Sequence, residues 1–361
     1  MSDGVGMCVY REEVGDPAVL AAWSRLIGQG ALHSPFDNPV WARSLTEVAG
    51  LAPTLQVLVI TDASDGILGL LPLEWPPAGR GPRMITAPGG RWLAADAVDV
   101  IALPRHREAV AAAVVTHLAA TRDWDVIDLD SLRPDGALAA ALWRLAPALL
   151  LPTEPVLAPY VDLSAGRDGL AWSRNLRQQV GRGLRAAEGA GGGLEVATDP
   201  DRVVALLDVL MALHVERFGV TSRVFATAER RQFHRIVAQR LAGQGAARIY
   251  RLDQGREGED AALLYAFALN DRLFYYALGM APGLGGSPGR TVLGAAILAA
   301  ADEGLREFDL LRGSHDFKLR FSSGTRANVS VRLLRPSVGG LRFAAQRIPR
   351  RALVLLRRRG S

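Results

Sequence analysis

Two stretches of the chain repeat one pattern of apolar and polar positions. Residues 107–130 and 290–310 each run from an alanine-rich helical segment through a short polar turn into a strand that carries an aspartate. These aspartates are Asp128 and Asp309. Apolar residues spaced three and four apart are typical of a helix, whereas a short apolar run between turns is typical of a buried strand. The sequence therefore predicts two copies of one helix–turn–strand unit.

The segments that precede these units also correspond. Residues 55–75 and 247–280 alternate apolar runs with polar turns, a pattern typical of antiparallel hairpins. Helical patterns come before both of them. We therefore predict an α/β (α+β) fold with two tandem domains, each a mixed twisted sheet flanked by helices. The expected limits are residues 1–156 and 157–336, followed by a basic tail at 337–361.

The C-terminal segment differs in charge from the rest of the chain. No Asp or Glu follows Asp316, and residues 317–361 contain Lys318 and eleven arginines, whereas the whole chain has a net charge of only +5. A segment of this kind is suited to a polyanionic partner. We expect the arginine-rich tail to bind tRNA or an anionic membrane surface, with a solvated tail as the alternative. The oligomeric state stays open.

The composition argues against disulfide-bonded, metal-dependent and membrane-spanning classes. Cys8 is the only cysteine, which excludes an intrachain disulfide and a metal site built on several cysteines. The histidines show no zinc-binding spacing, so we predict no metal site. The longest apolar window, residues 137–152, is shorter than the roughly 20 residues that span a bilayer. We expect a cytoplasmic protein, with peripheral attachment to the inner membrane as a second interpretation.

The densest group of polar side chains lies in residues 308–321, FDLLRGSHDFKLRF. Asp309 and Arg312 fall at the end of the predicted strand, where ligands gather in open α/β sheets. The segment also holds Lys318, the only lysine among 42 basic residues. Because arginine serves everywhere else in the chain, we expect this ammonium to have a role that a guanidinium cannot fill.

A short helix is expected to begin within this segment. Ser314 is predicted to be its N-cap. His315 and Lys318 would then share one helix face, and Asp316 and Arg320 would share another. A histidine beside a buried carboxylate can move protons near neutral pH. The alternative is a purely structural network of salt bridges.

A glycine-rich loop, MAPGLGGSPGRT at residues 280–291, connects a predicted strand to a predicted helix. Free backbone N–H groups and the helix dipole attract phosphate at such a junction. The loop lacks the spacing and the lysine of a P-loop, so we predict no NTPase. The alternative to a phosphate site is a plain flexible connection. The residues expected to contact donor phosphates are Gly289, Arg290, Thr291 and Gly294.

The segment from Asp309 to Phe321 resembles the C-terminal signature of one branch of the GNAT superfamily. Members of that branch are associated with cellulose and exopolysaccharide synthesis, look like two fused GNAT-type domains, and are related to the Fem-type aminoacyl transferases. Residues 33–45 and 213–219 are similar to two further segments of the same branch. The positions that fit the signature are Asp309, Leu311, Arg312, Gly313, Lys318, Arg320 and Phe321.

The resemblance implies two tandem GNAT-like domains and an acyltransferase. The donor would be acetyl-CoA or another acyl-CoA, used as a co-substrate without a permanently bound cofactor. The acceptor would be an amine or hydroxyl of a small molecule, a sugar or a cell-envelope precursor. Two features depart from the family pattern. Phe317 stands where the family has tyrosine, and the acyl-CoA loop is degenerate, with Leu293 and Ala295 after Arg290.

Two other functions stay open at this point. A Fem-type transferase would take its acyl group from aminoacyl-tRNA, which the arginine-rich tail and the degenerate loop favour. A non-catalytic scaffold would keep the fold within a membrane biosynthetic complex. For a transferase, the residues expected to be catalytic are Asp309, His315 and Lys318, and those expected to bind substrate are Arg312, Arg320 and Tyr276.

Overall fold

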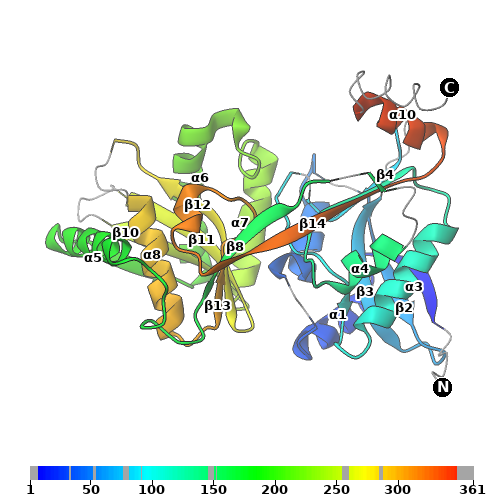
Figure 1. The fold of residues 1–361 in the computed structure, drawn as a ribbon, viewed down its shortest axis with the longest axis horizontal. Helices are drawn as coiled ribbons and strands as arrows, with labels where there is room; N and C mark the ends of the chain where they lie inside the picture. The colour runs from blue at the N-terminus through cyan, green and yellow to red at the C-terminus, as the bar shows by residue number, and fades with distance from the viewer. Residues whose placement is uncertain are drawn as a thin grey trace.

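A single mixed β-sheet runs through the part of the chain that the computed structural model describes (Figure 1). Three clusters of buried apolar side chains form the core on the two sides of this sheet. The fold is therefore α/β with a mixed, helix-flanked sheet, as the sequence predicts. The described residues are 7–31, 34–51, 54–75, 81–90, 92–144, 150–151, 153–253, 260–283 and 288–347.

The strands of the two halves follow the same order. The N-terminal unit contains, side by side, β1 (Cys8–Glu13), β2 (Thr54–Thr61), β3 (Ile67–Trp75), β4 (Met84–Thr86) and β6 (Val126–Leu132). The C-terminal unit contains, in the corresponding order, β9 (Gly193–Ala197), β10 (Ala247–Asp253), β11 (Asp260–Leu269), β12 (Arg272–Met280) and β13 (Glu307–Asp309). Neighbouring strands are antiparallel, except for the parallel pairs β4–β6 and β12–β13. The predicted repeat is confirmed.

The main helices also repeat between the units. They are α1 (Pro17–Gly28), α2 (Pro39–Glu47) and α3 (Arg107–Ala120) in the first, and α6 (Pro200–Phe218), α7 (Ala228–Ala242) and α8 (Pro288–Asp302) in the second. In three of them the side chain of Asp16, Asn38 or Asp199 accepts hydrogen bonds from the first turn, and a proline follows. Such a cap satisfies N–H groups that lack a partner within the helix. Among the described helices, none has both the length and the apolar character needed to cross a bilayer.

The remaining elements connect or extend the two units. They are β5 (Ile101–Ala102), α4 (Ala137–Arg144), β7 (Leu150–Leu151), β8 (Val156–Asp162), α5 (Arg174–Gly189), α9 (Asp316–Leu319), β14 (Gly324–Leu334) and α10 (Val338–Arg347). Two short 3-10 turns lie at Pro35–Asp37 and Gly219–Thr221. The predicted domain limit at residue 156 thus falls at the first residue of β8.

The two units exchange one strand each. β8 follows the N-terminal unit in the chain but pairs with β13 of the C-terminal unit. β14 ends the C-terminal unit, yet its second half pairs with β6 of the N-terminal unit, while its first half pairs with β8. Each unit therefore gains a strand from the other half of the chain, and β14 links both units through backbone hydrogen bonds, crossing the middle of the molecule in Figure 1.

Two ion pairs hold β14 in this position. Asp128 on β6 pairs with Arg332 of β14 at an oxygen–nitrogen distance of 2.9 Å. Asp309 on β13 pairs with Arg326 of the same strand at 3.5 Å. All four side chains are largely buried. The two aspartates that repeat in the sequence therefore have the same structural partner, the exchanged strand.

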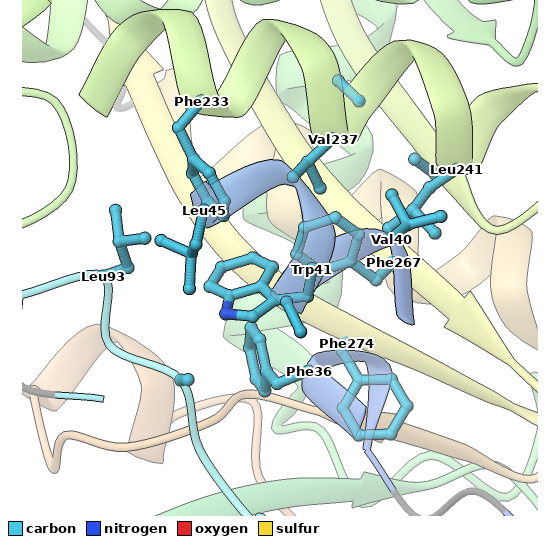
Figure 2. Close-up of a cluster of buried hydrophobic side chains, with 14 of the residues drawn as sticks. Phe36, Val40, Trp41, Leu45, Leu93, Phe233, Val237, Leu241, Phe267 and Phe274 are labelled. Carbon is cyan, nitrogen blue, oxygen red and sulfur yellow. The ribbon is translucent and has the colours of Figure 1, made fainter. Parts of the chain in front are cut away.

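The two units also share a hydrophobic core around α2 and α7 (Figure 2). Trp41 is fully buried and meets Phe233 and Phe267 edge-on, with ring centroids 4.9 and 6.3 Å apart. Phe36 meets Phe267 at 6.1 Å. Alternate residues of β11 face this core and the core beneath α5 and α8, so helices cover both faces of the C-terminal sheet. Around Trp41, the two units are therefore joined by one continuous apolar core.

The first part of the predicted basic tail is an ordered helix. α10 packs on β14 and β6, and its Phe343 side chain is buried there. Ser337, just before the helix, donates a hydrogen bond of 2.6 Å to Asp125. Val338 and Leu341 are exposed on the opposite side. The rest of the tail, residues 348–361, lies outside the described residues.

Replacing Trp41 tests whether the two units unfold together. Trp41→Ala removes a fully buried ring from the shared core, so we expect the free energy of unfolding to fall by about 3–5 kcal/mol. Urea denaturation followed by circular dichroism should still show one transition. Trp143→Ala is the control, because this side chain on α4 is 46% exposed and its loss should cost less than about 1 kcal/mol. Two separate transitions, or equal losses in both variants, would contradict a shared core.

Candidate functional site

The parallel pair β12–β13 separates in the middle of the C-terminal unit. The last paired residues are Phe274 and Asp309, and from there to Met280 no described strand pairs with β12 on this side. On its other side, β12 pairs with β11 through a bulge, because Tyr276 has no opposite residue between the two neighbouring pairs. A bulge bends a strand and changes the direction of its side chains. The structure thus leaves an open edge of β12 beyond Phe274.

His214 on α6 binds this open edge. Its Nδ1 lies 3.0 Å from the backbone oxygen of Leu278. Because a carbonyl oxygen can only accept, Nδ1 carries the proton and Nε2 keeps its lone pair. Burial lowers the pKa of His214, and the nearby Arg217 guanidinium lowers it further, while the bond to Leu278 acts in the opposite direction. The ring is therefore neutral at pH 7.

Lys318 fixes the loop that leaves β13. Its buried Nζ donates hydrogen bonds of 2.8 Å to the backbone oxygens of Leu310 and Arg312, and it lies 4.8 Å from the centre of the Tyr275 ring. Burial lowers the pKa of this ammonium to about 8. The nearby carboxylates of Asp96 and Asp309 act in the opposite direction and raise the pKa. A guanidinium is wider and planar and cannot place one nitrogen between these two oxygens. These contacts therefore explain why the single lysine of the chain stands at this position.

Asp309 supports the same loop from the strand. One carboxylate oxygen accepts a bond of 2.7 Å from the backbone N–H of Leu311, and the other faces Arg326. Leu311 has a φ of 53°, which is unfavourable for a leucine, so the carboxylate stabilises a strained turn. Burial raises the pKa of Asp309 to about 6. Both oxygens of the predicted catalytic carboxylate are therefore engaged.

Arg312 joins the two units. Its backbone N–H and its guanidinium both bind Asp96, and its Nη1 lies 2.5 Å from Asp130. Asp96 is almost fully buried, and both aspartates belong to the N-terminal unit. The guanidinium predicted to bind substrate is thus held in an ion-pair network. Nothing in the sequence signals this pairing, because the partners lie far away in the chain.

Tyr276 lies in the seam between the units. Its hydroxyl donates to the backbone oxygen of Leu93 at 2.6 Å and lies 3.2 Å from Nε2 of His234. His234 is fully buried on α7, and burial lowers its pKa to about 3. Its Nδ1 and the hydroxyl of Tyr265 are buried without a hydrogen-bond partner among the described residues. Tyr276 therefore belongs to a neutral polar cluster at the opposite face of β12 from Lys318.

The helix expected to begin at Ser314 is shorter than predicted. α9 begins at Asp316, and His315 occupies the N-cap position without a capping side-chain bond. The backbone of His315 is extended, with φ −62° and ψ 137°, so Ser314 cannot cap the helix. His315 is exposed and stacks on Phe317 at 6.0 Å. Arg320 is also exposed and borders a cleft of about 600 Å³. The cleft is lined by Ala171, Ser173, Asn175, Leu176, Gln179, Leu319, Arg320 and Ser322.

The predicted phosphate-contacting residues divide into two groups on α8. Thr291 and Gly294 face α5, where a side chain at Gly183 would collide with Thr291 and one at Gly294 would collide with Val180. These two residues serve helix packing. Gly289 lies against β12, since a side-chain carbon there would approach Leu278 and Met280 at 3.2 Å, and Arg290 binds Gln179 at 2.5 Å. The preceding residues 284–287 lie outside the described residues.

The structure therefore brings Asp309, Arg312 and Lys318 together around one loop. His315 and Arg320 are exposed beyond this loop, and Tyr276 lies on the opposite face of β12. No sequence pattern assigned a site role to His214, His234, Asp96 or Asp130. For His214 the only sequence signal was its place in residues 213–219. Among the described residues, no group of three or more His, Cys, Asp or Glu side chains could hold a metal ion.

The strand divergence, the helix beyond it and the repetition of both in two units define a tandem GNAT-like fold, the architecture of an acyltransferase-like protein. Residues 174–319, from α5 to α9, match the family model of an acetyltransferase (GNAT) domain. The comparison with curated proteins finds no match. The predicted fold class, with two tandem GNAT-like domains, is thereby confirmed.

Solved structures share this fold over most of the chain. FemX is 12% identical, over 85% of this chain and 92% of its own, with a TM-score of 0.57. The C-terminal domain of a putative lysylphosphatidylglycerol synthetase from Agrobacterium fabrum is 12% identical over 90% and 94%, with a TM-score of 0.53. A tandem GNAT protein from the clavulanic acid biosynthesis pathway is 14% identical over 92% and 100%, with a TM-score of 0.50. At these identities the likeness establishes the fold alone.

Lys318→Arg tests the structural reason for the lone lysine. The larger guanidinium must displace the 310–312 loop or the Tyr275 ring, so we expect the free energy of unfolding to fall by about 1–3 kcal/mol. Urea denaturation at pH 7 measures this loss. Arg320→Lys is the matched control at an exposed position two residues away, where a change within about 0.5 kcal/mol is expected. Equal stability of both variants would show that the loop does not depend on the ammonium.

Proposed function

We propose that this chain is an acyltransferase whose reaction takes place where β12 separates from β13. One observation carries the proposal: the parallel pair ends at Phe274 and Asp309, and β12 continues with an unpaired edge and a bulge at Tyr276. Backbone N–H groups on such an edge can hold an acyl group and stabilise the oxyanion that forms during transfer. No covalent nucleophile is required, because positioning the two substrates supplies much of the rate.

The loop after β13 would form the second wall of this site. Lys318 and Asp309 hold its backbone, and Arg312 fastens it to the N-terminal unit. A rigid wall keeps the reacting atoms aligned. A displacement of about 1 Å between these atoms can lower the rate by about 100-fold. We propose that these three residues act mainly through the geometry of the loop. His315 is exposed at its end and stays a candidate for contact with the acceptor.

We propose acyl-CoA as the donor, with its phosphates near the start of α8. Two observations support this placement. α8 is the next element after β12 in the chain, and its Gly289 lies against Leu278 and Met280 of the open edge. The first turn of a helix offers free N–H groups and a positive dipole end to phosphate. Arg290 adds a positive charge at the same point.

Aminoacyl-tRNA is the second candidate donor. The fold likeness to FemX and to a putative lysylphosphatidylglycerol synthetase supports it, as does the arginine-rich segment after Asp316. The acceptor in either case would be an amine or hydroxyl of a small molecule, a sugar or a cell-envelope precursor, with an exopolysaccharide among the sugars. A non-catalytic scaffold is the remaining alternative, and the donor screen described next distinguishes it from a transferase.

A donor screen tests the proposal. The protein is mixed in turn with acetyl-CoA, longer acyl-CoAs and aminoacyl-tRNA, and both the melting temperature and the transfer to amine and hydroxyl acceptors are measured. A ligand at 100 times its Kd should stabilise the folded state by about 2.7 kcal/mol. If acyl-CoA is the donor, Arg290→Glu should weaken its binding about tenfold, whereas Arg144→Glu on the distant α4 should not. If the protein binds none of these donors and transfers no acyl group from any of them, the non-catalytic scaffold is favoured.

The tail offers a separate prediction about partners. Deleting residues 348–361 removes five arginines but keeps α10, so we expect an unchanged melting temperature. Binding to tRNA and to vesicles rich in anionic phosphatidylglycerol should weaken and become less sensitive to salt. A full-length variant with the same five arginines changed to glutamine should behave like the deletion. If the unaltered protein binds neither partner at low salt, the tail is only solvated.

A further inference from the structure

Acyl transfer needs a group that takes a proton from the acceptor. An amine or hydroxyl attacks well only when its lone pair is free, and the bond that it forms leaves it with one proton too many. Of the residues predicted to be catalytic, Asp309 has both oxygens occupied by Leu311 and Arg326. Lys318 directs its ammonium at two backbone oxygens and the Tyr275 ring. The ammonium has no lone pair to offer, and the carboxylate of Asp309 is directed at the turn around Leu311 and at Arg326 of β14.

We propose that His214 is the general base of this reaction, an assignment that rests on the acyl transfer proposed above. Its imidazole is the titratable side chain that binds the unpaired edge of β12 directly, through Leu278. That bond holds the ring in one orientation and keeps the proton on Nδ1, so Nε2 presents a lone pair. Among the described residues, Nε2 has no hydrogen-bond partner of its own.

The surroundings of His214 suit a base that is neutral at pH 7. The rings of Phe218 and Phe225 lie 4.6 and 5.2 Å from the imidazole, and β12 contributes the Leu278 carbonyl. The charged group that acts on the ring is Arg217, from the same helix, and it disfavours the imidazolium. Both the apolar rings and this cation lower the pKa.

An acceptor can reach this imidazole from outside. His214 is only partly buried, Phe218 is 41% exposed and Val220 in the following turn is 93% exposed. The exposed Phe218 ring lies 4.6 Å from the imidazole, so an acceptor that reaches His214 from solvent passes an apolar side chain.

The proton balance of the step is simple. The lone pair of the acceptor forms a bond to the acyl carbon, and His214 Nε2 takes the proton that the acceptor loses. The bond from the acyl carbon to the leaving atom, the sulfur of CoA or an oxygen of tRNA, then breaks. The leaving atom keeps the electron pair of that bond. The imidazolium returns the proton to that leaving group. No oxidant, metal or further co-reactant is needed.

His214→Gln provides the first test. The glutamine amide can still donate to the Leu278 oxygen, so the contact between α6 and β12 is kept, but it cannot accept a proton. We expect kcat/KM to fall by about 100-fold or more. In the unaltered enzyme kcat/KM should rise with pH until His214 loses its proton, below about 6.5, and then level off. This acid limb should be absent in His214→Gln. His106→Gln, in the N-terminal unit, should keep both the rate and the limb.

Two further measurements separate a base from a structural histidine. His214→Ala should regain activity when free imidazole is added, because the small molecule can enter the vacated space and accept the proton. In the full-length protein, long-range proton–nitrogen NMR spectra of His214 should show the proton on Nδ1 and a pKa below 6.5. A proton on Nε2 would overturn the assignment whether or not activity is found.

The outcomes distinguish this inference from the function on which it rests. If the unaltered protein transfers an acyl group and His214→Gln keeps the rate and the acid limb, acyl transfer stands and His214 is not the base. If the unaltered protein transfers from no donor in the screen, the proposed function falls and the assignment falls with it. Transfer that is lost in His214→Gln, loses its acid limb and returns with imidazole supports both.

Discussion

The exchange of β8 and β14 between the two units is the constraint on which the rest of this structure depends. β14 hydrogen-bonds to β8 with its first half and to β6 with its second, and Asp128 and Asp309 hold it by ion pairs at both ends. Because the units also share the core around Trp41, neither can move far without breaking backbone pairing and exposing apolar surface. The sheet is thus one rigid frame.

This frame gives the divergence of β12 and β13 a fixed geometry. The loop after Asp309 is held by Lys318 from one side and by Asp96 and Asp130, through Arg312, from the other. α6 packs against β12 and places His214 on Leu278 at the open edge of that strand. The site is therefore built from both units, although the strands that diverge belong to one, and a rigid scaffold with an open strand edge is what transfer by positioning requires.

The sequence predicted those features that have a local cause. The repeated helix–turn–strand pattern, the hairpins and the aspartates carried by the predicted strands follow from apolar periodicity and turn residues. It could not predict what Lys318 binds, because a backbone oxygen leaves no trace in a sequence. The partners of Arg312 lie in the other unit, and the exchange of strands has no local signal. The cap at Ser314 was wrong because the tethered loop keeps His315 extended.

The exchanged strand also has a consequence for synthesis of the protein on the ribosome. β6 is complete after Leu132, but the strand that covers its edge, β14, is translated only from Gly324 onward. During that interval the newly made N-terminal half carries an uncovered strand edge and half of a core, features that invite association between nascent chains. Native folding has to wait for pairing across this long separation, which makes it slow. A chaperone that shields strand edges would act on this protein before its last strand is made.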